Sequence, residues 1–345
     1  MAQSTLDNEY LPGLSIDAYL NLIRTQFPEL VDTVWLDRVG EGAVPAQLAD
    51  LVNEFEDDTN EGRGTSYRRA QRDRMVRSTG IRSLFCLAAD VDDVVRIPRR
   101  WRLLDVLGGD GLLAQMLKTV APQVEDTVIT SDLAGHMVRA ALHNNLPAIR
   151  QAAQFLLMRD EVVDAVLLAY GTHHIDPADR SLACQEAARV LRPGGRLVLH
   201  DFEEGSPVAR WFSQVVHPYS RAGHAYRHFT AEEMSRCMES AGLRLVGVHR
   251  MYDPLIVRGA GPVEVCRRLA DYLINMYGLT GVAEGAAGDD AQDAVWRLAQ
   301  TSFRYGADDG PDNGSTWQHS PAVYNDGSTW VAEVPRVALV AVGEK

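Results

Sequence analysis

The sequence has little positive charge, few cysteines and no long apolar run. Lys and Arg number 34 against 47 Asp and Glu, and the formal net charge of −13 argues against a nucleic-acid face spread over the molecule. The four cysteines form no Cys-x-x-Cys pair, which argues against a zinc knuckle or a disulfide framework. No window holds the roughly 18 apolar residues that cross a membrane, and the N-terminus lacks a basic start followed by an apolar core. We therefore expect a cytoplasmic protein with no membrane or nucleic-acid partner.

Residues 63–77, "RGTSYRRAQRDRMVR", hold a local concentration of positive charge. Runs of this kind are most often a solvated helix face paired with nearby acids, such as "EFEDD" at 54–58. Because aromatic content in the run is limited to Tyr67, we prefer that interpretation to phosphate binding.

Helical spacing dominates residues 1–97. The segment "LSIDAYLNLIRTQF" starts at a Ser15 or Asp17 cap and repeats apolar positions on one face. Residues 44–58 repeat the pattern, and residues 68–90 predict a third helix and the start of a fourth. We expect this region to form a lid or a dimerisation surface, which leaves a homodimer open.

From residue 102 onward, apolar strands alternate with helices. Apolar strands separated by helices predict an α/β fold with a mostly parallel sheet covered on both faces. The strand candidates are residues 102–107, 126–131, 163–169, 196–201, 244–251 and 336–342.

An insertion of about 80 residues separates the last two strand candidates. It contains helical patterns at 262–278 and 291–304 and a short repeat, "DNGSTW" at 312–317 and "NDGSTW" at 325–330. Asn-Gly and Asp-Gly pairs favour hairpin turns, so we expect two turns of a small β element.

A glycine-rich turn follows the first strand. In "LLDVLGGDG" the strand ends at Asp105, and a helix opens directly after the turn. Gly108, Gly109 and Gly111 let the backbone pass close to a ligand. Asp132 ends the second strand 21 residues beyond Gly111, the spacing at which a carboxylate binds the two hydroxyls of a ribose. This order predicts a nucleotide site.

The segment "RVLRPGGRLVLHDF" at 189–202 narrows the kind of nucleotide. With it, residues 100–251 and the last strand resemble the class I S-adenosylmethionine-dependent methyltransferases. The resemblance implies a seven-stranded Rossmann-like sheet with helices on both faces, whose last strand, here "RVALVAVG", runs antiparallel between the fifth and sixth. We expect three parts: a helical N-terminal region (1–97), a cofactor-binding core (98–253 plus 331–345) and a helical and β insertion capping the substrate pocket (254–330).

The resemblance also implies which residues hold S-adenosylmethionine. The methionine portion and its amino group fall to the turn, namely Asp105, Gly108, Gly109 and Gly111. The nucleoside falls to Asp132 at the ribose and to Leu133 and Met137 at the adenine.

Two positions depart from the family pattern. Leu107 stands where the first glycine of the turn is usual, so we expect a re-registered turn with Gly108 or Gly109 at positive φ. Ala153 stands where an acid often meets the adenine amino group, and Gln154 is the expected substitute.

The resemblance implies that the transferred group faces the loop after the fourth strand, here "AYGTHHID". We predict His173 or His174 as a base, because a neutral histidine near pH 7 can take a proton from the acceptor. Tyr170 is a catalytic and cofactor-binding candidate, since a tyrosine ring can stabilise the positive sulfur. At the end of the fifth strand, Asp201 is expected in the catalytic group and His200 at the substrate.

Residues 210–229 are rich in His, Tyr and Arg, which a plain surface helix does not need. We expect this segment to face the substrate. The contacts predicted within it are His217, Tyr219, His224, Tyr226 and His228. For Arg221 and Arg227 we favour salt bridges with nearby glutamates over a substrate carboxylate.

The histidines near Asp201 raise the question of a metal. Two histidines and a carboxylate would suit iron, but His173 and His174 are adjacent, and adjacent side chains often point apart. Because no spacing is diagnostic, we expect no metal.

These patterns favour a methyltransferase that acts on a small molecule. We expect in-line transfer from S-adenosylmethionine to an acceptor of bacterial secondary metabolism, assisted by a histidine base. Two alternatives stay open. A synthase of the azetidine-2-carboxylate type would cyclise S-adenosylmethionine and release methylthioadenosine, and a degenerate methyltransferase fold would bind a partner without catalysis.

Overall fold

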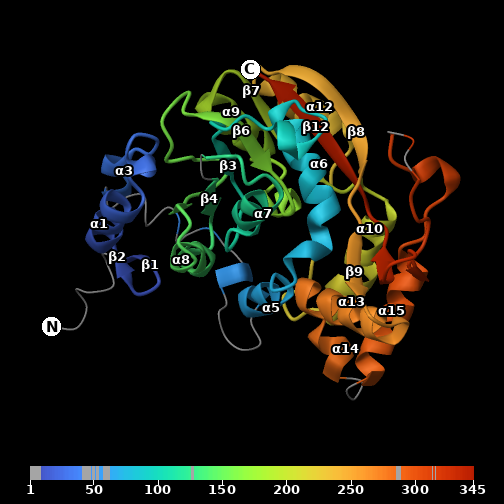
Figure 1. Cartoon of the computed structure of the whole chain (residues 1–345). Coiled ribbons are helices and arrows are strands. Elements are labelled where there is room, and N and C mark those ends of the chain that lie inside the picture. Colours follow the sequence, from blue (N-terminus) through green and yellow to red (C-terminus); the bar gives the residue numbers. More distant parts are fainter. Residues whose placement is uncertain are drawn as a thin grey trace.

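A seven-stranded sheet forms the centre of the computed structural model (Figure 1). The structure describes residues 9–40, 48, 51, 54–56, 63–125, 128–284, 289–312, 314 and 316–345. In sheet order the strands are β5 (Ala148–Arg150), β4 (Ile129–Asp132), β3 (Leu103–Asp105), β6 (Val163–Leu168), β7 (Leu191–Asp201), β12 (Val337–Glu344) and β8 (Arg244–Tyr252).

Strand directions within this sheet agree with the sequence prediction. The first five strands are parallel, and β12 runs antiparallel between β7 and β8. Residues 337–343 of β12 are all buried, as expected of a strand covered on both faces. The predicted α/β class and the antiparallel last strand are therefore confirmed.

Helices cover the sheet on both sides (Figure 1). On one face lie α6 (Ser78–Ala89) and α7 (Leu112–Val120), and on the other lie α9 (Arg180–Val190) and α12 (Ala231–Ser240). The remaining core elements are α8 (Gly135–His143), α10 (Pro207–Trp211), α11 (His217–Tyr219), the π-helix η5 (Phe212–Val216) and the 3₁₀ turns η2 (Arg74–Arg77), η3 (Val94–Arg96) and η4 (Thr172–His174).

The N-terminal region packs against the β5 edge of the sheet. It comprises β1 (Glu9–Leu11), β2 (Leu14–Ser15), α1 (Ile16–Gln26), α2 (Pro28–Val31) and α3 (Leu36–Gly40), which lie on the left of Figure 1. Ser15 caps α1, as the sequence predicted. The hydroxyls of Tyr10 and Tyr19 donate hydrogen bonds to the carbonyls of Arg150 and Ala148. These bonds fasten the region to an edge strand, where backbone groups would otherwise be open.

Two further N-terminal helices were predicted in part. The helix expected over 44–58 lies mostly outside the described residues, which include its 3₁₀ turn η1 (Glu54–Glu56). The segment 68–90 contains the end of α5 (Arg63–Ala70), the turn η2 and then α6, in agreement with a third helix followed by a fourth.

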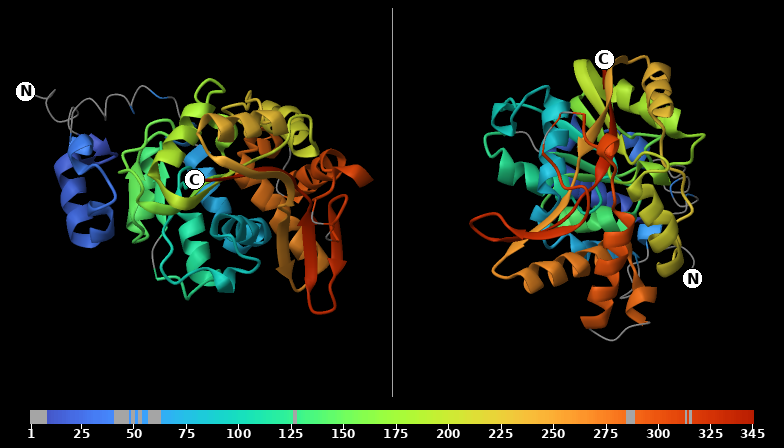
Figure 2. Two further views of the ribbon diagram at one scale, coloured as in Figure 1. Left: turned by 90° about the horizontal axis from the view of Figure 1, so that it is seen from above. Right: turned by 90° about the vertical axis from the view of Figure 1, so that its right-hand side faces the viewer.

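The insertion between β8 and β12 forms a separate group of elements beside the sheet (Figure 2). Its elements are β9 (Leu255–Gly259), α13 (Pro262–Tyr277), α14 (Thr280–Glu284), α15 (Asp289–Ser302), η6 (Ala307–Asp309), β10 (Ala322–Asn325) and β11 (Trp330–Val334). Strands β10, β11 and β9 make a small antiparallel sheet.

The repeated hexapeptide has two different structures. "NDGSTW" is the hairpin turn between β10 and β11, as predicted. The described residues of "DNGSTW" lie in the connection from η6 to β10 and not in the small sheet, and Asn313 of the Asn-Gly pair lies outside the described residues, so a second turn there stays a prediction.

Helix α5 joins the insertion to the core. Its Arg63 and Ser66 donate hydrogen bonds to the carbonyls of Met276 and Asn275 at the end of α13. These carbonyls lack partners within their own helix, so α5 satisfies them. Among the described residues, no helix is both long and apolar enough to cross a membrane.

Candidate active site

A cavity of about 360 Å³ lies at the carboxyl ends of the parallel strands. It opens beside β3, whose neighbours β4 and β6 lie on opposite sides, so it occupies the crevice where ligands bind in doubly wound sheets. Its walls come from the loops after these strands, from Leu51 and Phe55, and from Tyr67 of α5. The lining includes ten residues singled out from the sequence: Leu107, Gly109, Asp132, Leu133, Met137, Ala153, Gln154, Tyr170, His174 and Tyr226.

The glycine-rich turn has Gly109 at positive φ, as predicted, whereas Leu107 and Gly108 do not have positive φ. Gly109 has φ +56° and Gly111, which caps α7, has φ +89°. Gly108 donates to the carbonyl of Ser131 at 2.8 Å. A Cβ atom at Gly108 would lie 2.8 Å from Oδ2 of Asp105, so glycine is required there by close approach. Leu107 contributes its side chain to the cavity wall.

Asp132 is held in place by backbone donors. Its Oδ2 accepts from the N–H of Gly109 at 2.9 Å, and its Oδ1 accepts from the N–H of Ala134 at 2.8 Å. Burial raises the pKa of Asp132 to about 6, and these N–H groups oppose the rise. At neutral pH the carboxylate is therefore mostly ionised and keeps lone pairs for a ligand in the cavity.

Beneath the turn lie two buried ionisable groups that lack full hydrogen bonding. Asp105 is 1% exposed and its Oδ2 has no partner among the described residues. Burial, together with the charge of Asp132, raises the pKa of Asp105 to about 8. Arg77 is 3% exposed, and although its Nη2 donates to the Tyr67 hydroxyl at 3.2 Å, its Nε has no partner there. Unsatisfied buried charge is costly, which is typical of a binding site rather than of a core.

Arg77 corrects one interpretation of the sequence. It lies in the basic run that was expected to be a solvated helix face, yet its guanidinium is buried 4.5 Å from the centre of the Tyr170 ring. One face of Tyr170 is therefore already occupied by a cation, and the remaining ring surface is what is available to a sulfonium.

Tyr170 has an unusual backbone conformation, with φ +61°. A positive φ is unfavourable for a bulky residue and persists when surrounding contacts impose it. The Tyr170 hydroxyl donates to Oδ1 of Asp253 at 3.1 Å, and Arg336 holds Oδ2 of the same carboxylate at 2.6 Å. Gly80 makes room for Asp253, because a Cβ atom there would lie 1.8 Å from Oδ1.

His200 lies behind Tyr170 and does not line the cavity. It is fully buried, its Nδ1 accepts from the backbone N–H of Tyr170 at 3.4 Å, and its Nε2 lies 3.7 Å from Asp253. A substrate contact for His200 remains a prediction, and its observed contacts are those of a group that supports Tyr170.

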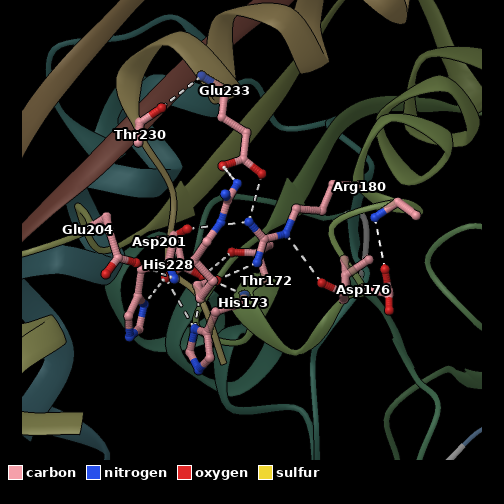
Figure 3. Close-up of polar contacts among 12 residues, drawn as sticks. Thr172, His173, Asp176, Arg180, Asp201, Glu204, His228, Thr230 and Glu233 are labelled. Carbon is pink, nitrogen blue, oxygen red and sulfur yellow. Dashed lines mark hydrogen bonds and ion pairs between the residues drawn. The ribbon is translucent and has the colours of Figure 1, made fainter. Parts of the chain in front are cut away.

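Asp201, at the end of β7, is the centre of a second polar group, which includes residues of the loop after β6. Its oxygens accept from Nδ1 of His173 and from Nδ1 of His228, both at 2.9 Å, and from the Thr172 hydroxyl (Figure 3). The backbone N–H groups of His173 and Phe202 donate to it at 2.7 Å. Burial opposes its ionisation, but His173 and His228 hold the pKa of Asp201 well below its usual range. Asp201 is therefore a buried carboxylate anion that orients two imidazoles.

His173, His174 and His224 meet beside this carboxylate. The ring centres of His173 and His174 are 4.4 Å apart, and His224 lies 5.0 Å and 5.3 Å from them. The two adjacent histidines thus point to the same place, contrary to the expectation that they would diverge. Burial lowers the pKa of all three, that of His224 to about 2 and that of His174 well below its usual value. The imidazoles are neutral at pH 7.

Only some residues of the histidine- and tyrosine-rich segment 210–229 contact the site. Tyr226 lines the cavity and packs on His174, with ring centres 4.4 Å apart. His217 accepts from the backbone N–H of His224 at 2.8 Å, so its nitrogen contacts the protein instead of the cavity. Tyr219 is 38% exposed beside α14.

Two arginines hold the same segment against α12. Arg180 and Arg227 each donate to Glu233 at 2.8 Å, and Figure 3 shows the Arg180 pair. Arg227 therefore forms a salt bridge with a glutamate, but its partner is Glu233 and not Glu203, Glu204 or Glu232, which the sequence suggested.

Several residues at the site were not predicted from the sequence. Phe55 and Tyr67, which line the cavity, and Arg77, which is buried behind it against Tyr67 and Tyr170, belong to the N-terminal region, where their patterns indicate ordinary amphipathic helices. Asp179 lines the cavity beside Ala153 and accepts from Gln154 at 3.3 Å. An acid without a sequence motif of its own thus lines the same cavity as Ala153.

The chain matches a known protein family in sequence and is similar to individual methyltransferases. Residues 42–248 match a family described as a methyltransferase domain. The chain is 33% identical, over 145 residues, to the ubiquinone/menaquinone biosynthesis C-methyltransferase UbiE of Syntrophotalea carbinolica, covering 36% of this chain and 59% of that protein. It is 27% identical over 192 residues to UbiE of Stutzerimonas stutzeri, covering 47% of this chain and 73% of that protein. Phosphoethanolamine N-methyltransferase 2 of Haemonchus contortus, in complex with S-adenosyl-L-methionine, has a TM-score of 0.49 at 14% identity, over 86% of this chain and 60% of that one.

Proposed function

Because the chain belongs to the class I S-adenosylmethionine-dependent methyltransferases, we propose that it transfers the methyl group of S-adenosylmethionine to a small-molecule acceptor in the cavity. When bound, the cofactor supplies an electrophilic sulfonium methyl group. The protein has to hold the cofactor, position the acceptor, exclude water and remove a proton.

The residues beneath the turn suit the two charges at the amino-acid end of the cofactor. Asp105 offers a carboxylate oxygen without a partner to an ammonium group. Arg77 offers an unpartnered Nε–H to a carboxylate, and its planar fork matches that group. We propose that these two residues bind the methionine portion, with Gly109 allowing close approach of the backbone.

The nucleoside of the cofactor is assigned to the side of the cavity formed by β4 and the loop after it. We propose that Asp132 accepts hydrogen bonds from the ribose hydroxyls, since its carboxylate faces the cavity while Gly109 and Ala134 fix its orientation. Leu133 and Met137 provide apolar wall for the adenine. Gln154 and Asp179 provide the polar edge that the family's usual acid would supply.

The acceptor end of the cavity is bounded by His174, Tyr226 and Phe55. We keep the histidine base as part of the proposal and assign it to His174, which lines the cavity. The lowered pKa of His174 makes the neutral form the resting state, but it also makes this imidazole a weak base. An acceptor from bacterial secondary metabolism remains a prediction made from composition.

The observation that carries the proposal is the cradle around Asp132 and Asp105. One carboxylate is fixed by backbone donors at the cavity wall, and the other is left buried with an unpartnered oxygen. This combination fits a ligand that has both a ribose and an ammonium group.

A binding and product experiment tests the proposal. Calorimetry should detect S-adenosylmethionine binding, and Asp132→Ala should weaken it at least tenfold, because hydrogen bonds to a charged group contribute roughly 1.5–3 kcal/mol. The exposed Asp37→Ala is the control. The protein is then incubated with the cofactor, with and without small-molecule acceptors, and the nucleoside product is identified by mass spectrometry.

The products separate the three functions. S-adenosylhomocysteine that forms only with an acceptor supports methyl transfer. Methylthioadenosine formed without an acceptor contradicts methyl transfer and indicates the cyclising synthase. Absence of cofactor binding contradicts both and indicates a binding protein without this activity.

A further inference from the structure

The meeting point of His173, His174 and His224 has the geometry of a metal site. Each residue presents one ring nitrogen, and the three nitrogens lie within 4.8 Å of one another. Three histidines around one divalent ion have nitrogens roughly 3.4 Å apart, because each lies about 2.0–2.1 Å from the metal. Nitrogens 4.8 Å apart therefore need to approach by up to about 1.4 Å, a change that rotation of the side-chain torsions can supply.

The hydrogen bonding of His224 fits a metal ligand. His224 is 7% exposed, and its buried Nε2 has no hydrogen-bond partner among the described residues. Such a nitrogen loses its hydration without compensation, which is costly unless something else binds it. Phe212 stacks on the His224 ring with centres 4.3 Å apart and fixes its plane.

Asp201 supplies the support that metal-binding histidines need. Its carboxylate accepts from Nδ1 of His173, which leaves Nε2 of that ring for a ligand. A carboxylate behind a histidine raises the basicity of the ligand nitrogen and fixes the ring. Its negative charge also offsets Arg63 and Arg180, the nearby cations that oppose a bound ion.

We propose that His173, His174 and His224 bind a divalent transition-metal ion at the inner end of the cavity. Imidazole ligands suit Zn²⁺, Fe²⁺ and Co²⁺ rather than Mg²⁺ or Ca²⁺. His174 lines the cavity, so coordination positions not taken by histidine face the space in which the acceptor lies. The site departs from our expectation, based on the sequence, that no metal is present.

With the ion bound, His174 is a metal ligand instead of the base assigned to it above, and the ion takes over the task of easing deprotonation of the acceptor. An acceptor hydroxyl bound to the metal loses its proton to water more easily than the free hydroxyl does, so no strongly basic side chain is needed. The acceptor is then one that offers an oxygen to the metal. This role in catalysis rests on the proposed function, whereas the metal site itself does not.

Metal binding is tested on untagged, full-length protein that has been treated with a chelator and desalted. Calorimetry without cofactor or acceptor should give one Zn²⁺ per chain, and Co²⁺ should give the visible bands of a nitrogen-ligated ion. His174→Ala and His224→Ala should each weaken Zn²⁺ binding at least tenfold. The exposed His249→Ala, outside the cluster, is the matched control and should bind as the wild type does.

A second measurement guards against variants that fail to fold. X-ray absorption of the wild-type protein loaded with Zn²⁺ should give three imidazole nitrogens at about 2.0–2.1 Å. The proposal is overturned if the wild type binds no Zn²⁺ at micromolar concentration, or if fewer than two imidazoles surround the ion. It is also overturned if both folded variants keep wild-type affinity. Cofactor binding by the metal-free protein is measured separately, so failure of the metal proposal can be distinguished from failure of the proposed methyltransferase function.

Discussion

Replacing Asp105 by asparagine should stabilise the cofactor-free protein, and increasingly so as the pH rises. Asp105 is 1% exposed with an unpartnered oxygen, and burial together with the charge of Asp132 raises its pKa from 3.8 to about 8. Asparagine keeps the shape of the side chain but removes the ionisation.

The sign follows from proton binding in the two states. Between pH 4 and pH 8 the unfolded chain has lost the proton of Asp105 while the folded chain keeps it. The folded state therefore binds more protons, and the free energy of unfolding falls as the pH rises, by at most about 1.4 kcal/mol per pH unit for one group. This loss is small near pH 4 and complete above the folded pKa.

The expected magnitude follows from the same shift. From pH 5 to pH 8.5 the ionisation of Asp105 should lower the free energy of unfolding by about 4 kcal/mol. A folded pKa one unit lower would give about 3 kcal/mol. The change is large against the whole stability of a typical domain, about 5–15 kcal/mol.

Urea unfolding of wild type and Asp105→Asn at several pH values between 5 and 8.5 measures this directly. The difference between the two proteins cancels every titrating group that does not interact with Asp105, so its pH dependence belongs to Asp105 and to its coupling with Asp132. The exposed Asp37→Asn serves as the matched control. A difference of constant size across the pH range would refute the reasoning, and cofactor binding by Asp105→Asn should be weakened even though the variant is more stable.

Two further substitutions test the surroundings of the cofactor cradle. Arg77→Lys should reduce cofactor affinity about tenfold in calorimetry, because lysine cannot reproduce a planar fork, while Arg74→Lys on the exposed part of η2 should not. Gly80→Ala should lower the melting temperature, since its Cβ atom would lie 1.8 Å from an oxygen of Asp253, and overpacking of this kind costs about 1–3 kcal/mol. Gly261→Ala, where the new atom has open space, should lower the melting temperature by less, because it loses only the preference for glycine at the N-cap of α13, and equal melting of both alanine variants would contradict the argument.

The cofactor turn was predictable because its signals are local. Strand, turn and helix follow one another within a few residues, so the positive φ of Gly109 could be predicted from the displacement of glycine by Leu107. Asp132 is likewise tied to the end of its own strand. Such features depend on the backbone preferences of the residues that form them, so a short stretch of sequence is enough to predict them.

The remaining walls of the cavity depend on contacts between distant parts of the chain. Arg77 has the same sequence surroundings as its exposed neighbours, and only the packing of η2 beneath Tyr170 makes it a buried group. Within residues 210–229, His224 and Tyr226 reach the site while Tyr219 turns towards α14. The composition of this segment identified it as part of the site, but it did not show which of its side chains contact the site.

The antiparallel strand β12 has a consequence for the order of folding. Leu339 pairs with Asp201 on one side and with Arg250 on the other, so strands β7 and β8 are joined by a strand that comes far later in the chain than either. Closing so long a loop costs entropy before any contact repays it, and such pairing slows folding. We expect the strand that carries Asp201 to gain its second neighbour only late in folding, so that the histidine site becomes rigid after the cofactor cradle has formed. Hydrogen exchange during refolding would then protect β3 and β4 before β7.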